Sequence, residues 1–148
     1  MLLEDKLLED LKVAMKTNNT VQKNTVQLIR ATILTEKKNK QRELTDLEVE
    51  DLIMKEKKKR LDTLAQIEQT NRTDLIQQTQ QEIMYISNYL PQPISEYELE
   101  QEIAKIIKET GATSKTMGPL IKQVKDKFGN RTDGRTISMI VKKLLNIG

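Results

Sequence analysis

The sequence predicts an all-α protein, and three observations lead to that prediction. Apolar residues recur every three or four positions in seven segments, which is the spacing of one helix face. No segment alternates apolar and polar residues as a half-buried strand would. The chain has only five Gly and three Pro in 148 residues, which favours long helices and few turns. Because aromatic residues make up 3% and Trp is absent, we expect an aliphatic core.

The first two helices are expected at about residues 2–17 and 21–40. The segment TNNT at residues 17–20 separates them, because Asn and Thr side chains favour caps and turns. Three lysines close the second helix, which suits the negative end of a helix dipole. The residues expected to face the core are Leu3, Leu7, Leu11 and Ala14, then Val21, Thr25, Leu28 or Ile29, and Ile33.

The third and fourth helices are expected at about residues 46–69 and 72–90. TDLE at residues 45–48 is a capping box, and NRTD at residues 71–74 resembles an N-cap with an acid in the first turn. The fourth helix must stop before Pro91, because the residue before a proline is displaced from the α region. The expected core residues are Leu47, Leu52 or Ile53, Leu61, Leu64 and Ile67, then Leu75 or Ile76, Thr79, Ile83, Ile86 and Leu90.

Three shorter helices are expected at about residues 96–109, 114–128 and 134–146. Ser95 with Glu98 forms a second possible capping box, and Asp133 is an N-cap candidate. Gly111 and Gly129 are placed where glycine ends helices. The expected core residues are Leu99, Ile103, Ile106, Met117, Leu120 or Ile121, Val124, Phe128, Ile137, Val141 and Leu144.

The segment NYLPQP, residues 88–93, is predicted to separate two domains. Pro91 stops one helix, Pro93 stiffens the link, and Ser95 begins the next helix. We therefore expect an N-terminal antiparallel helical domain at residues 1–92 and a small three-helix domain at residues 93–148. The alternative is an ordinary helix–helix turn inside one domain.

The composition argues against most kinds of catalysis. The chain has no Cys and no His, so thiolate metal sites and the usual catalytic triads cannot form. No glycine-rich phosphate loop is present. The acidic groups fit helix caps and solvated surface better than a water-bridged Mg²⁺ site. We expect no enzyme activity, no metal and no cofactor, and a cytoplasmic protein without a membrane span or a signal peptide.

The net positive charge of the chain lies in its last quarter. Residues 113–148 contain 8 Lys or Arg and 2 acidic residues, both Asp. Residues 1–112 contain 17 Lys or Arg and 20 Asp or Glu. A basic patch of this kind is typical of a surface that binds a polyanion, and a solvated, solubilising surface is the alternative. The candidate nucleic-acid-binding residues are Lys115, Lys122, Lys125, Lys127, Arg131, Arg135, Lys142 and Lys143.

Two other basic runs favour a solvated interpretation. KEKKKR at residues 55–60 places five bases around most of a helix, and pairs such as Glu56 with Arg60 lie at i, i+4 spacing. KKNKQR at residues 37–42 is similar. No aromatic residues interleave these runs, so stacking on single-stranded bases is not expected. Recognition of a folded RNA through shape and phosphates fits better.

Several short motifs, in order, resemble the YqeY-like proteins of the GatB/YqeY family. They are RELTD (42–46), KKKR (57–60), NRTDL (71–75), YLP (89–91), ETGATS (109–114), MG (117–118) and DG (133–134). The resemblance spans nearly the whole chain and implies a larger N-terminal helical domain followed by a three-helix domain. The chain differs from the family pattern at Gln27 and Pro119, where basic residues are usual. We expect Gly118 to serve helix packing.

The resemblance also implies a function. The related segment forms the tail of GatB, a subunit of tRNA-dependent amidotransferase, and that tail is associated with tRNA binding. Such proteins are labelled as carbon–nitrogen ligases with glutamine as amide donor, but this chain corresponds to the tail alone. We therefore expect a non-catalytic tRNA-binding module. The alternative is a module whose N-terminal helices dock on an amidotransferase or aminoacyl-tRNA synthetase complex.

Overall fold

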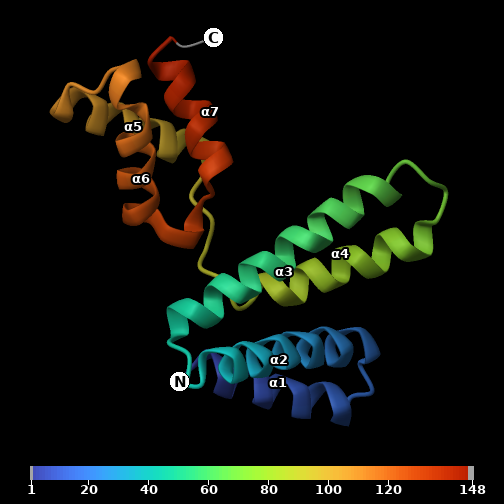
Figure 1. Cartoon of the computed structure of the whole chain (residues 1–148). Coiled ribbons are helices and arrows are strands. Elements are labelled where there is room, and N and C mark those ends of the chain that lie inside the picture. Colours follow the sequence, from blue (N-terminus) through green and yellow to red (C-terminus); the bar gives the residue numbers. More distant parts are fainter. Residues whose placement is uncertain (1, 147–148) are drawn as a thin grey trace. The chain divides into compact units, whose positions relative to one another are not determined.

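The structure, a computed structural model, describes residues 2–146 and confirms the all-α prediction. Within that range the chain forms seven α-helices, two short 3₁₀ helices and no strand (Figure 1). The helices are α1 (Leu3–Lys16), α2 (Thr20–Lys40), α3 (Asp46–Ile67), α4 (Thr73–Ser87), α5 (Glu96–Thr110), η1 (Ser114–Thr116), α6 (Met117–Phe128), η2 (Gly129–Arg131) and α7 (Gly134–Leu144). The chain divides into two compact units, residues 1–90 and 91–148, and each has its own apolar core.

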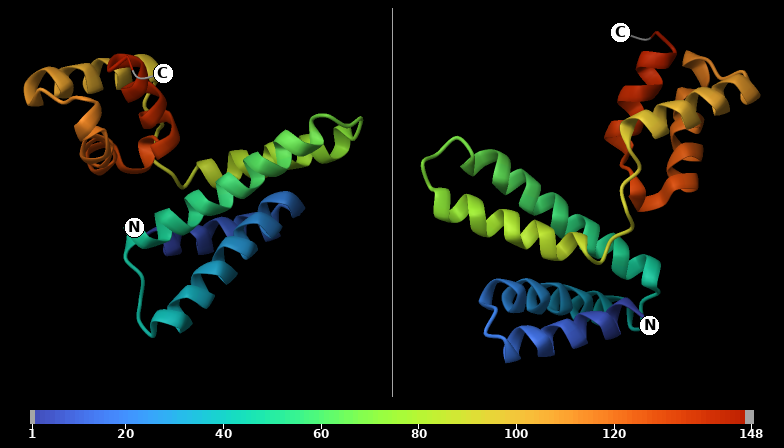
Figure 2. Two further views of the ribbon diagram at one scale, coloured as in Figure 1. Left: turned by 45° about the horizontal axis from the view of Figure 1, so that its top comes forward. Right: turned by 180° about the vertical axis from the view of Figure 1, so that it is seen from behind.

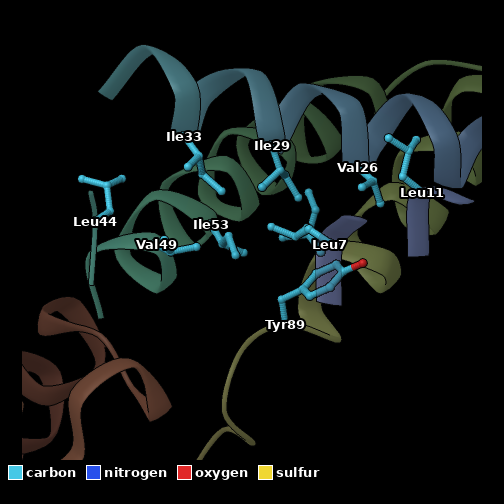
Figure 3. Packing of buried hydrophobic residues seen from close by; sticks show 10 residues of the cluster. Leu7, Leu11, Val26, Ile29, Ile33, Leu44, Val49, Ile53 and Tyr89 are labelled. Carbon is cyan, nitrogen blue, oxygen red and sulfur yellow. The ribbon is translucent and has the colours of Figure 1, made fainter. Parts of the chain in front are cut away.

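Unit 1 consists of two antiparallel helical hairpins, α1–α2 and α3–α4, which stack as two layers (Figures 1 and 2). Helix α2 contacts both helices of the second hairpin, and α1 contacts α3. The core between the layers is aliphatic apart from one aromatic side chain, Tyr89 (Figure 3). Its buried residues are Leu7, Leu11, Val26, Ile29, Ile33, Leu44, Val49, Ile53, Ile86 and Tyr89.

Tyr89 joins the last turn of unit 1 to α1. Its hydroxyl donates a hydrogen bond to the Asp10 carboxylate, and the Lys6 ammonium lies 5.2 Å from the centre of its ring. Burial, and then the bond to Asp10, raise the pKa of the Tyr89 phenol well above its ordinary value. This contact fixes the end of the chain segment that leads out of the unit.

Local signals placed most helix ends correctly. The Thr45–Glu48 capping box is present in both directions, and the Asn19 side chain caps α2 by accepting from the Gln22 N–H. For NRTD, the expected acid in the first turn of α4 is confirmed as Asp74, but the expected side-chain cap is wrong, since Arg72 occupies the N-cap and makes no capping bond. Asp74 instead pairs with Arg72, at 3.3 Å between carboxylate and guanidinium.

The expected core face of α3 is partly wrong. Leu47 and Leu61 are exposed, whereas Val49 and Ile53 are fully buried. The buried stripe continues to Glu56, which the sequence placed on a solvated face. The predicted Glu56–Arg60 pair is present at 2.7 Å, but both side chains lie largely inside the contact between α3 and α4. The neighbouring hairpin determines which stripe of α3 is buried.

Unit 2 is built from α5, α6 and α7, with α7 packed against both of the others. Its core consists of Leu99, Ile103, Ile106, Leu120, Val124, Ile137, Ile140 and Val141. Ser95 caps α5 by accepting from the Glu98 N–H, Gly111 ends α5 at φ +68°, and Asp133 caps α7. The Ile94 N–H donates to the Arg131 carbonyl at 2.9 Å, which attaches the segment after Pro93 to this unit.

Candidate nucleic-acid interface

Charge is distributed unevenly within unit 2. Helix α5 carries five glutamates, and residues 113–146 carry the eight bases predicted from the sequence together with two aspartates. Unit 1, by contrast, has 15 basic and 15 acidic residues. A polyanion would therefore be attracted to the part of unit 2 formed by α6 and α7 and repelled by α5.

Four of the eight bases are exposed and have no hydrogen-bond or ion-pair partner among residues 2–146. These are Lys115, Lys122, Arg135 and Lys142. Lys115 lies in η1, just before α6, and Lys122 lies in the second turn of α6. Arg135 and Lys142 belong to the first and last turns of α7. We call these four residues the free bases.

The free bases point away from the core of unit 2. Lys122 lies two residues after buried Leu120, and two helical residues correspond to a rotation of about 200°. On α7, Arg135, Met139 and Lys142 follow i, i+4, i+7 spacing, so they share one exposed face. Met139, between the two bases, is 63% exposed. This face offers cations with an apolar side chain between them.

Two further bases form ion pairs with glutamates of α5. The Lys127 ammonium lies 3.2 Å from the Glu102 carboxylate, and the Lys143 ammonium lies 3.3 Å from the Glu100 carboxylate. These contacts tie α5 to α6 and to α7. Nothing in the local sequence marked the two glutamates as partners. The only available signal was the acidic composition of α5.

The remaining two bases donate hydrogen bonds to backbone carbonyls. The half-buried Lys125 ammonium donates to the carbonyls of Gly129 and Thr132, at 2.7 and 3.0 Å, and so closes the turn between α6 and α7. The Arg131 Nε donates to the Gln92 carbonyl at 3.1 Å. Lys125 is thus part of the turn between α6 and α7, whereas Arg131 is exposed and uses its Nε to hold the segment that precedes α5.

The glycines of the MG and DG motifs lie at open positions. A Cβ built on Gly118 or on Gly134 would meet nothing within 4 Å, and neither residue has a positive φ. The expectation that Gly118 serves close helix packing is therefore wrong. Both glycines lie in the first turn of their helix, beside the free bases Lys122 and Arg135.

The aromatic side chains of unit 2 lie away from the face that carries the free bases. Tyr97 is exposed on α5, and Phe128 is half-buried and packs against the core. Across residues 2–146, no cluster of three or more acidic residues is arranged to hold a metal ion. None of the described helices is both long enough and apolar enough to cross a membrane.

The chain was compared with known proteins. A sequence model of the family described as Yqey-like protein matches residues 4–145. A search of curated proteins gives no match. The family match covers all seven α-helices except the first residue of α1, and its range includes the motifs from RELTD to DG. The chain therefore belongs to the family of YqeY-like proteins.

Proposed function

We propose that this protein is a non-catalytic module that binds tRNA through the outer face of α6 and α7. The observation that carries the proposal is the division of the eight bases. Four of them are exposed and unpartnered on η1, α6 and α7, within residues 2–146, while five of the seven acids of the unit lie on α5. The resemblance to the tail of a tRNA-dependent amidotransferase subunit supports tRNA as the polyanion.

The proposed mode of binding is contact with the phosphates of a folded RNA. Lys and Arg side chains position a protein on the phosphate backbone, and the wide minor groove of an RNA helix is recognised largely by shape. No described aromatic side chain is exposed on α6 or α7, which disfavours base stacking as the main interaction. Four direct phosphate contacts would give a slope of about −3.6 for log K against log salt concentration.

The test compares two double variants with the same change of charge. Lys122→Gln/Lys142→Gln removes one free base from each of α6 and α7, and Lys127→Gln/Lys143→Gln removes one paired base from each. Binding of purified total tRNA is titrated for both variants and the native protein at several salt concentrations. We expect the first variant to bind more weakly and its salt slope to become shallower by about 2.

Two results would contradict the proposal. Equal losses in both variants would mean that the paired bases contribute as much as the free ones, and an unchanged affinity in the first variant would remove the free bases from the interface. Circular dichroism of both variants confirms that the helices are intact. Incubation with glutamine and ATP tests the non-catalytic part, since turnover of either by the protein alone would contradict it.

A further inference from the structure

Unit 1 carries an open groove between α1 and α2, which run side by side in both views of Figure 2. The groove has a volume of about 460 Å³, and its lining combines apolar side chains such as Leu8, Leu11 and Leu34 with the charged side chains of Asp5, Arg30 and Lys37. A second depression of about 180 Å³ between the same helices includes Met15. Met15 and Leu34 are 56% and 55% exposed, so this face of the α1–α2 hairpin leaves apolar surface uncovered.

A charged stripe runs along α1 beside this groove. Asp5, Glu9, Lys12 and Lys16 follow one another at spacings of four, three and four residues, which places them on one helix face. All four are exposed, and none has a hydrogen-bond or ion-pair partner within the described part of the chain, residues 2–146. Two like-charged pairs, Asp5–Glu9 and Lys12–Lys16, thus stand at i, i+4, which disfavours an isolated helix.

The helix dipole explains only the ends of this stripe. Acids at the start of a helix and bases at its end are favourable, but the effect falls off beyond the first and last turns. Glu9 and Lys12 lie in the middle of a helix of 14 residues. Along the stripe both acids precede both bases. Its N-terminal half is therefore negative and its C-terminal half is positive.

We propose that the α1–α2 face binds the same face of a second copy of this chain, with the two α1 helices antiparallel. A two-fold axis between positions 10 and 11 of α1 would bring Asp5 opposite Lys16 of the second copy, and Glu9 opposite Lys12 of the second copy. Every charge of the stripe then meets its opposite. Leu8 and Met15 lie on either side of the same centre, so their apolar surface is covered in the same contact.

Charge reversal tests this pairing without depending on any other property of the protein. In Asp5→Lys/Glu9→Lys the whole stripe is basic, and in Lys12→Glu/Lys16→Glu it is acidic. Sedimentation equilibrium of the full chain should show a dimer for the native protein and a dissociation constant at least about ten-fold higher for each variant alone. An equimolar mixture of the two variants should form the heterodimer with its affinity restored.

A matched control separates the stripe from net charge. Asp62→Lys/Glu68→Lys makes the same change at exposed residues of α3 and its C-cap, and it should dimerise like the native protein. Circular dichroism verifies that each variant is folded. A native protein that stays monomeric, reversals that leave the dimer intact, or a mixture that stays monomeric would each overturn the proposal. A native protein that stays monomeric and instead binds a different protein through this groove would also overturn the proposal.

Discussion

Replacing Glu56 with Ala should destabilise unit 1 more than any other single change of a charged residue. Glu56 is 5% exposed, and its carboxylate lies 2.7 Å from the Arg60 guanidinium and 3.3 Å from the Lys59 ammonium. Arg60, with 14% of its side chain exposed, reaches across to Glu82 of α4, with 3.3 Å between Nε and the carboxylate. The cluster lies inside the α3–α4 contact, where water compensates charges poorly.

The expected loss follows from what Glu56→Ala leaves behind. Removing one partner of a buried ion pair costs about 3–5 kcal/mol, because the other charge stays buried and uncompensated. Arg60 retains Glu82, so we expect the lower end, about 3 kcal/mol. Urea unfolding followed by circular dichroism measures this change. The methyl NMR signal of Ile86 assigns the loss to unit 1, whose core contains that residue.

A double variant distinguishes uncompensated charge from lost packing. Glu56→Leu/Arg60→Met replaces the buried pair with apolar side chains of comparable volume, and such replacements are often neutral or stabilising. We expect it to be more stable than Glu56→Ala by about 2 kcal/mol or more. If the double variant is as unstable as the single one, the cost arises from packing or from Glu82, and the reasoning about the Arg60 charge is refuted.

Three further predictions concern titration and backbone. Because burial and Asp10 raise the pKa of Tyr89, its contribution to stability is complete below the ordinary tyrosine pKa of about 10 and is lost as the pH rises above it. The unfolding temperature should therefore fall above pH ~10 more steeply in the native protein than in Tyr89→Phe. Hydrogen bonds from Arg42 lower the pKa of Glu48, so its contribution is present above the ordinary glutamate pKa of about 4.3 and is lost as the pH falls below it. Urea midpoints measured from pH ~5 to ~3 should fall less in Glu48→Gln than in the native protein. Gly134→Ala should raise the free energy of unfolding by about 0.4–1 kcal/mol, measured by urea titration, because the position is helical, open and without a positive φ.

Local signals sufficed to predict the order and approximate limits of the helices. Capping residues such as Thr45, Ser95 and Asp133 act on N–H groups two or three residues away, so their effect is visible in a short stretch of sequence. The buried face of α3 could not be predicted in the same way. Val49 and Ile53 are buried because the α1–α2 hairpin covers their face of α3. Leu47 and Leu61 follow an equally good helical spacing, but they lie on a face of α3 that no described helix covers.

In the candidate interface, too, local sequence signals do not predict which side chains are engaged in the fold. All eight bases can be read from the sequence, but their partners are distant in the chain. Glu102 is 25 residues from Lys127, and Glu100 is 43 residues from Lys143. The carbonyls that hold Lys125 belong to a turn whose geometry depends on the packing of α6 against α7. Which bases are free is therefore a property of the folded unit.

This difference has a quantitative consequence for RNA binding. If all eight bases contacted phosphates, the slope of log K against log salt concentration would be about −7, whereas the four free bases give about −3.6. If the two bases paired with α5 turned to phosphate, Glu100 and Glu102 would lose their cations and would lie near the RNA as uncompensated acids. A slope of about −3.6 is thus expected while these two ion pairs hold. A slope of about −5.4 in the native protein would mean that Lys127 and Lys143 also contact phosphates, and the Lys127→Gln/Lys143→Gln variant would then lose as much affinity as the variant that lacks two free bases.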